Sequence, residues 1–339
     1  MNIFKQIIGI DVSKDSLSVV YASQDYTQTI KASSVKEFAN SIQGFKKLLV
    51  WSLQQKREET LPMHFLMEAT GVYYENLAYF LTDHKQSVVV VLPNKAKYFA
   101  RSLEIKSKTD DLDAVMLAQL GLSRNLKQWV PPSNDLRKLK ALCREYHATI
   151  KLLTQLKNRL HAKQKAYDTP KEVLAYLQLE IRSLKNIVRE ILADIGTLVE
   201  GTPDLRQKVK NITTIKGVGL ITAASIIAET DGFAQIHNTK QLASYAGLDV
   251  VANESGTIHH RTKISKKGNS HIRQAIYMSS LSACRYNKSL KDLYVRLTIK
   301  NNIKMIGLIA VARKLLILIY TLYKKNEPFN PEYGVRIAV

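Results

Sequence analysis

The sequence predicts a mixed α/β region followed by two helical regions. Alternating apolar and polar residues come first, then short apolar runs separated by helical stretches, then seven-residue repeats and an Ala-rich helical part. Strands that precede an alternation of strands and helices indicate a mixed sheet covered by helices. We expect an α/β domain over residues 1–130, a coiled-coil helical linker over 131–200 and a mainly helical domain over 201–339.

The first region begins with the strand pattern. Apolar and polar residues alternate from Gln6 to Val20 around a bend at residues 11–15, and residues 27–32 can add a third strand. The rest of the region alternates strands and helices. Helices are expected at Val35–Leu53, at Tyr73–Thr82 and after Pro93 and Thr109, and strands at His64–Glu68 and Ser87–Leu92.

Seven-residue apolar repeats predict two long helices that pair as a coiled coil, within one chain or between chains. A plain helical hairpin without partner subunits is the alternative. The first repeat has the series Leu136, Cys143, Ile150 and Lys157 and the series Leu139, Tyr146, Leu153 and Leu160. After Pro170 the series are Leu174, Ile181, Val188 and Ile195, and Leu177, Leu184, Ile191 and Leu198.

The charge of the chain predicts a polyanionic partner. Fifty Lys and Arg against 29 Asp and Glu give a net charge of +21, and neutralising phosphates releases their condensed counterions. Residues 257–325 contain 15 Lys and Arg and one acidic residue, Asp292, so the C-terminal part is the strongest candidate for binding phosphates. The alternative is a basic soluble protein without a polyanionic partner.

Composition also indicates the cellular compartment in which the protein is expected. The two cysteines, Cys143 and Cys284, form no CxxC pair, so neither a disulfide framework nor a zinc site is predicted. The apolar start is too short for a signal peptide. Residues 305–323 are apolar but contain Arg313 and Lys314, so we expect a core helix there and no membrane partner. The expected location is the bacterial cytoplasm, in association with the nucleoid.

Four carboxylates are the candidate metal ligands. Asp11 and Glu68 end predicted strands, and Asp110 and Asp113 lie three residues apart at a predicted helix start. Mg²⁺ prefers a few carboxylates with water and phosphate oxygens, and such sites stabilise in-line phosphoryl transfer. Taken alone, Asp110 could simply cap a helix and Asp11 could close a turn.

These residues stand in three blocks: GIDVSK at 9–14, MEATG at 67–71 and KTDDLDA at 108–114. Together they resemble the catalytic blocks of the DEDD transposases of bacterial insertion sequences, the Piv/MooV-type and bridge-RNA-guided serine recombinase family. The resemblance implies an RNase H-like, RuvC-like fold for the first domain. It also implies that Asp11, Glu68, Asp110 and Asp113 are catalytic and bind Mg²⁺, with Mn²⁺ as an alternative, whereas Asp111 falls outside the quartet.

The C-terminal part extends the resemblance over nearly the whole chain. QLASYAGL at 241–248, ESG at 254–256, KISKKGN at 263–269 and the pair at 272–273 resemble the second conserved domain of these transposases. In that family the serine before the glycine is the nucleophile, which implies Ser255 here. The family often has a proline shortly after the Gly-Leu pair, where this chain has Asp-Val-Val.

Several residues are candidate nucleic-acid contacts. TTIKGVG at 213–219 resembles a helix-hairpin-helix turn, whose backbone amides hold a DNA phosphate. The alternative is that its glycines only allow close helix packing. Ser265 is a lesser rival nucleophile, and His259 and His260 fit a strand better than a zinc site. The predicted contacts are Lys216, Gly217, Gly219, Arg261, Lys263, Lys266, Lys267 and Arg273.

The leading hypothesis is a DNA recombinase that cuts and rejoins strands through a 5′-phosphoserine intermediate. The resemblance implies double-stranded donor and target DNA, a structured guide RNA (the bridge RNA), and a homo-oligomer, dimer or tetramer, with composite active sites. A RuvC-type junction endonuclease that uses water and a non-catalytic coiled-coil nucleic-acid-binding protein are the alternatives. A sugar-kinase-like ATPase is disfavoured because a later Gly-rich phosphate loop is missing.

Overall fold

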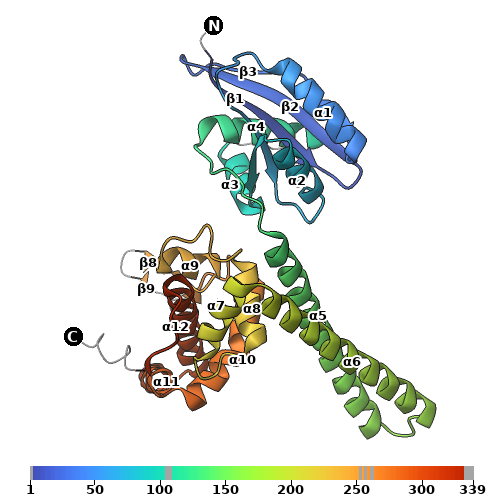
Figure 1. Cartoon of the computed structure of the whole chain (residues 1–339), viewed down its shortest axis with the longest axis vertical. Helices are drawn as coiled ribbons and strands as arrows, with labels where there is room; N and C mark the ends of the chain where they lie inside the picture. The colour runs from blue at the N-terminus through green and yellow to red at the C-terminus, as the bar shows by residue number, and fades with distance from the viewer. Residues whose placement is uncertain (1–2, 104–108, 252–253, 256–257, 260–262, 332–339) are drawn as a thin grey trace. The chain divides into compact units, whose positions relative to one another are not determined.

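The computed structural model describes residues 3–103, 109–251, 254–255, 258–259 and 263–331. The chain divides into two compact units, Met1–Pro131 and Pro132–Val339 (Figure 1). The first is a mixed α/β unit, and the second is mostly helical. The sequence-based expectation of an α/β region followed by a helical remainder is therefore confirmed.

A six-stranded mixed sheet forms the centre of the first unit. Strand β1 lies in the middle, antiparallel to β2 and parallel to β5, and β6 continues the parallel part. The path is β3-β2-β1-β5-β6, with β4 paired to β2. The strands are β1 (Ile3–Val12), β2 (Ser16–Asp25), β3 (Ile30–Ala32), β4 (Lys36–Ala39), β5 (Met63–Glu68) and β6 (Ser87–Val91).

Helices cover both faces of this sheet, so its central strands are apolar on both sides. One core combines Ile8, Ile10 and Phe65 with α1 (Ile42–Gln55) and α2 (Glu75–Asp83). The other combines Ile7 and Leu66 with α3 (Pro93–Ser102) and α4 (Asp110–Ser123). Successive residues of a strand point to opposite faces, which explains why neighbours on β1 belong to different cores.

The predicted helix from Val35 to Leu53 is wrong at its start. Residues Lys36–Ala39 form β4, which pairs antiparallel with β2 and buries Phe38 against the sheet. The helix begins only at Ile42, where the Ser41 hydroxyl accepts a hydrogen bond from the Gly44 amide. A serine cap of this kind marks a helix start, and the short strand before it lacked the length to be recognised from the sequence.

Two long helices open the second unit and pair within the chain. They are α5 (Asn134–Lys165) and α6 (Lys171–Gly201), and they form a hairpin that extends from the other helices of this unit (Figure 1). Residues of both predicted repeats are buried along the hairpin, among them Leu153 on α5 and Leu177 and Ile181 on α6. The helix pairing is thus intramolecular, and supercoiling or pairing between chains stays a prediction.

The remaining helices pack around one large apolar core. Helix α8 is buried from Thr222 to its last residue, Glu229. Helix α12 is, within the described part of the chain, the one helix long and apolar enough to cross a membrane, but its apolar face packs into this core. The helices are α7 (Pro203–Thr213), α8 (Leu220–Glu229), α9 (Thr239–Tyr245), α10 (Ser270–Tyr286), α11 (Lys288–Asn301) and α12 (Lys304–Lys325).

Candidate active site

Asp11 and Glu68 lie at the same end of two neighbouring parallel strands. The register pairs Ile10 with Met67, so Asp11 and Glu68 are the next residues on β1 and β5. Because Ile10 and Met67 belong to the core under α1 and α2, the alternation of the strands turns Asp11 and Glu68 toward the α4 face. Both carboxylates are half-buried.

Helix α4 brings the other two carboxylates to this end of the sheet. It starts at Asp110, after Thr109 has capped it by accepting a hydrogen bond from the Leu112 amide at 3.3 Å. One turn later the helix touches the strand backbone, because a Cβ at Gly9 would lie 2.4 Å from the Ala114 carbonyl oxygen. Since Ala114 directly follows Asp113, the first turn of α4 stands near the end of β1.

The structure thus places Asp11 and Glu68 at the same end of β1 and β5, and Asp110 and Asp113 on the first turn of α4. Within the described residues, no group of three or more His, Cys, Asp or Glu side chains is close enough to hold a metal ion. Glu68 instead accepts a hydrogen bond from the Thr70 hydroxyl at 2.8 Å. A set of four carboxylates without His or Cys fits a hard cation such as Mg²⁺ or Mn²⁺.

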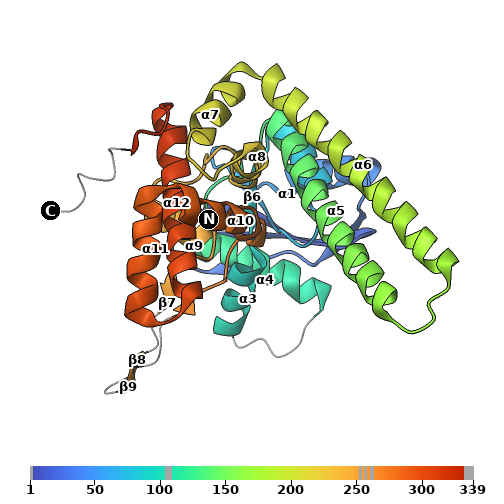
Figure 2. The same ribbon diagram turned by 90° about the horizontal axis from the view of Figure 1, so that it is seen from below.

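Ser255 belongs to an excursion of short strands in the second unit, between α9 and α10. Its base is a two-stranded ladder of β7 (Val250–Val251) and β10 (Lys263–Ile264). Farther along, β8 (Glu254–Ser255) pairs with β9 (Ile258–His259), so that Ser255 stands opposite Ile258. We call the two strand pairs β7–β10 and β8–β9 the serine hairpin. Its distal strands project away from the helices of this unit (Figures 1 and 2).

Two glycines let the ends of the serine hairpin cross closely. A Cβ at Gly268 would lie 2.4 Å from the Gly247 nitrogen and 2.5 Å from the Tyr245 carbonyl oxygen. Gly247 itself has φ of +65°, a conformation that favours glycine. The sequence motifs around these glycines are therefore explained by backbone contact where the two ends of the hairpin meet.

The predicted nucleic-acid contacts differ in their surroundings. Lys263 is exposed on β10, and Lys266 and Lys267 are exposed in the loop that leads to α10, whereas Arg261 lies outside the described residues. Arg273 is half-buried, and its Nη1 donates to the carbonyl oxygens of three loop residues at 2.9–3.3 Å. That guanidinium therefore holds the loop together.

In the turn before α8, one of the two glycines is needed for close helix packing. Gly217 has φ of +103°, and a Cβ there would lie 2.7 Å from the Ala283 nitrogen on α10. Close approach to α10 therefore requires this glycine. Gly219 precedes the first turn of α8 and has open space around it, and Lys216 is exposed.

Comparison with known proteins finds transposases over both parts of the chain. A family model described as Transposase matches residues 8–167, and one described as Transposase IS116/IS110/IS902 family matches residues 209–295. The pilin gene-inverting protein of Moraxella bovis is 30% identical over 336 residues, covering 96% of this chain and 98% of that protein. The chain belongs to the IS110/IS116 family of DEDD transposases.

Other relatives of this transposase family member are more distant. The transposase for insertion sequence element IS1111A of Coxiella burnetii is 24% identical over 163 residues, covering 47% of this chain and 44% of that protein. Among solved structures, Thermus thermophilus RuvC is similar with a TM-score of 0.28 and 13% identity, covering 37% of this chain and 99% of that one. The family consists of DNA-processing enzymes.

The structure also shows a buried polar cluster that the sequence did not predict. Glu229, at the end of α8, is 1% exposed. Its carboxylate accepts hydrogen bonds from Arg144 Nε at 2.6 Å, Arg144 Nη2 at 3.0 Å and Asn269 Nδ2 at 2.7 Å. Burial alone would raise the pKa of Glu229, but these donors outweigh it and hold the pKa below its usual value. We call Glu229, Arg144 and Asn269 the Glu229 cluster.

One signal in the sequence could have found this cluster. Glu229 is the single charged residue in the segment LITAASIIAE, and a lone carboxylate at the end of a buried helix needs a partner. The partners lie 85 and 40 residues away in sequence, so their identity depends on the tertiary fold.

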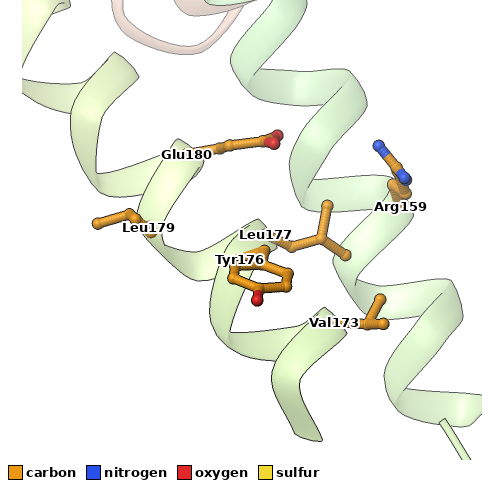
Figure 3. Close-up of a pocket in the computed structure, with 6 residues that line it drawn as sticks. All are labelled: Arg159, Val173, Tyr176, Leu177, Leu179 and Glu180. Carbon is orange, nitrogen blue, oxygen red and sulfur yellow. The ribbon is translucent and has the colours of Figure 1, made fainter. Parts of the chain in front are cut away.

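Two surface cavities lie apart from these sites. One, of about 410 Å³, lies on the α5–α6 hairpin, where Val173 and Leu177 point toward α5 and Leu179 points away from it (Figure 3). The other, of about 600 Å³, is lined by α3 and the end of α4, including Tyr98 and Arg124. Neither is lined by a predicted site residue of this transposase.

Proposed function

We propose that this transposase is a DNA recombinase of an insertion sequence that cuts and rejoins strands through a 5′-phosphoserine at Ser255. Asp11, Glu68, Asp110 and Asp113 would hold Mg²⁺, or Mn²⁺, for this reaction. The observation that carries the proposal is the position of Asp11 and Glu68 at the same end of neighbouring strands, in a chain of this family. The sheet order, with antiparallel strands on one side of β1 and parallel strands on the other, supports an RNase H-like fold.

The chemistry assigns separate tasks to the two parts of the site. A divalent cation bound by the carboxylates would supply positive charge beside the scissile phosphate. The Ser255 hydroxyl oxygen attacks the phosphorus, and its proton passes to a base. The bond to the 3′ oxygen breaks, that oxygen takes up a proton and leaves as a 3′-hydroxyl, and the serine becomes esterified to the 5′ phosphate.

Rejoining reverses this step with another strand. A 3′-hydroxyl attacks the phosphoserine, the new phosphodiester forms, and Ser255 regains its proton. No phosphodiester is lost overall, so the reaction needs no external energy source. The four carboxylates and Ser255 must act on the same phosphate, within one chain or between protomers, and we propose a dimer or tetramer.

We further propose three functional regions and a guide RNA. Residues 1–130 form the metal-binding domain, 131–200 the helical linker used in assembly, and 201–339 the domain with Ser255 and the phosphate contacts. A structured bridge RNA would select the donor and target sites by base pairing, which leaves the protein to bind backbone and shape. Sequencing RNA that copurifies with the protein, and altering its loops, tests whether the junctions are redirected.

Covalent trapping tests the recombinase against the two alternatives. Labelled DNA and Mg²⁺ are mixed with the protein, and adducts are separated in denaturing gels. We expect Ser255→Ala to abolish adducts and strand exchange, and Asp11→Asn to lower cleavage at least about 100-fold because a ligand carboxylate is neutralised. Asp15→Asn, an exposed neighbour on the β1–β2 turn, is the control and should retain activity.

The alternatives predict different results. If Ser255→Ala still cleaves branched DNA, the protein is a nuclease that uses water. If Asp11→Asn leaves cleavage unchanged and Mg²⁺ is not needed, the carboxylate site is not catalytic.

A second candidate outcome is inversion of a DNA segment. It rests on the 30% identity to the pilin gene-inverting protein, which extends over 98% of that protein. The chemistry is the same, and only the arrangement of the recombining sites differs. A plasmid that carries two sites in inverted orientation would be inverted between them, which a restriction map of the product detects.

A further inference from the structure

We propose that Glu229 is a positioning residue that fixes the serine hairpin relative to the helices of the second unit. It acts through Tyr245 and Asn269, which lie in the segments just before and just after the hairpin. The inference rests on the proposed role of Ser255. Glu229 is then a buried residue that the reaction requires, although its side chain touches no reacting atom.

Glu229 is hydrogen-bonded to the segments on both sides of the hairpin. Its carboxylate accepts from Asn269 Nδ2 at 2.7 Å, on the side that leads into α10. Its main-chain carbonyl accepts from the Tyr245 hydroxyl at 3.0 Å, at the end of α9. One residue of α8 therefore holds the segment that enters the hairpin and the segment that leaves it.

Further bonds join the two segments to each other. The Asn269 amide donates to the Tyr245 carbonyl at 2.7 Å, the Lys266 amide to the Gly247 carbonyl at 3.1 Å, and the Ser265 amide to the Asp249 carbonyl at 2.9 Å. The Asn269 side chain also caps α10, because its Oδ1 accepts from the amides of His271 and Ile272. The position of the hairpin base is thus set by Asn269, and Asn269 is set by Glu229.

Arg144 makes this anchor rigid. Its guanidinium binds the Glu229 carboxylate through two nitrogens, a geometry that fixes the orientation of the carboxylate. The Glu229 side chain is 2% exposed, whereas that of Arg144 is 47% exposed. An ionised carboxylate at this burial is unfavourable without such partners, so its presence calls for a role beyond filling the core.

A donor–acceptor exchange between Glu229 and Asn269 tests the proposal. Asn269→Asp keeps the oxygen that caps α10 but opposes the Glu229 carboxylate with a second carboxylate. The double variant with Glu229→Gln restores one hydrogen bond, with the amide on α8 and the carboxylate on the loop. Asp204→Asn is the matched control, because it removes an exposed ion pair with Lys208 on α7.

Two readouts are measured, namely adduct formation at saturating DNA and hydrogen exchange of the amides in residues 244–269. We expect Asn269→Asp to accelerate this exchange and to lower adduct formation about 100-fold, as a displacement of about 1 Å typically does, with DNA affinity unchanged. The double variant should recover most of both. Asp204→Asn should match the unaltered protein in both.

Specific outcomes would overturn the proposal. Unchanged exchange in Asn269→Asp, or equal losses in the single and double variants, contradicts it. If the unaltered protein forms no adduct, the proposed role of Ser255 fails, but the exchange data still decide whether Glu229 fixes the hairpin. If Asn269→Asp does not fold by circular dichroism, Tyr245→Phe provides a milder variant, expected to accelerate exchange at the same segment.

Discussion

At the scale of single residues, the four carboxylates predicted to bind metal are at least partly accessible, whereas the Glu229 carboxylate is buried. Asp11, Glu68 and Asp113 are half-buried and Asp110 is exposed, whereas Glu229 is 1% exposed and fully hydrogen-bonded. Accessible carboxylates can exchange protein contacts for a cation, while a buried one with three donors cannot. Exposure therefore separates the two kinds of site.

The half-buried His147 predicts a loss of stability on mild acidification. Burial, with a contribution from His271, lowers the pKa of His147, which pairs with the Ser225 hydroxyl at 3.1 Å. The unfolded chain takes up this proton first, as the pH falls below about 6.5, so the free energy of unfolding decreases there. His147→Gln should flatten this decrease between pH 7.5 and 5.5 in urea denaturation.

The control for this prediction is His161→Gln, because His161 is exposed on α5. It should leave the pH dependence unchanged. An identical pH profile in the unaltered protein and His147→Gln would contradict the assignment. Glu229 has a different effect on stability. Because its pKa is lowered in the folded protein, it stabilises the fold above about pH 4.5, and this stabilisation is lost as the pH falls through the pKa of the folded state.

Local sequence patterns single out candidate residues but not their tertiary contacts. Asp11 and Glu68 could be singled out because each follows a short apolar run that ends at the carboxylate. The phosphate contact expected of Arg273 stays a prediction, and the structure adds that its Nη1 donates to three carbonyl oxygens. That interaction depends on a loop conformation that no local pattern encodes.

At the scale of elements, close contact between α4 and β1 sets the position of two carboxylates. We expect Gly9→Ala to destabilise the first unit by about 2 kcal/mol or more, because its Cβ would meet the backbone of α4. It should also reduce cleavage, since α4 carries Asp110 and Asp113. Thermal denaturation and the cleavage assay measure the two effects.

Gly196→Ala is the matched control, because Gly196 lies within α6 and a Cβ there meets nothing within 4 Å. It should stabilise the protein by up to about 1 kcal/mol through helix propensity. Equal stability of Gly9→Ala and the unaltered protein would show that α4 does not pack this closely on β1.

The long helices and the strands β5 and β6 followed from the sequence, whereas β4 and the strands of the serine hairpin did not. Periodicity over ten or more residues identified α5 and α6. The four-residue strand β4 and the two-residue strands of the serine hairpin carry too few residues for a pattern. Their pairing depends on long-range contacts, such as β4 with β2 and β7 with β10.

At the scale of the whole molecule, the net charge of +21 predicts strongly salt-dependent nucleic-acid binding. Each phosphate neutralised contributes about 0.9 to the slope of log affinity against log salt. Replacing both Lys266 and Lys267 with Gln should lower this slope by about 1 to 2, whereas Lys171→Gln, on the α5–α6 hairpin, should not. Fluorescence anisotropy from 50 to 200 mM salt, about the range where such contacts weaken most, measures it.

A slope that stays the same in the double lysine variant would mean that the loop before α10 does not contact phosphate. An equal decrease in Lys171→Gln would mean that binding reflects the overall charge of the chain and no particular surface.

The most direct test of the account maps the covalent bond between protein and DNA. After reaction with Mg²⁺ and nuclease digestion, trypsin separates Ser255, in the peptide from Gln241 to Arg261, from Ser265, in the peptide from Ile264 to Lys266. We predict a nucleotide attached through its 5′ phosphate to Ser255, present with Mg²⁺, and absent in Asp11→Asn. Strand joining without any adduct, or an adduct on Ser265, would contradict the account.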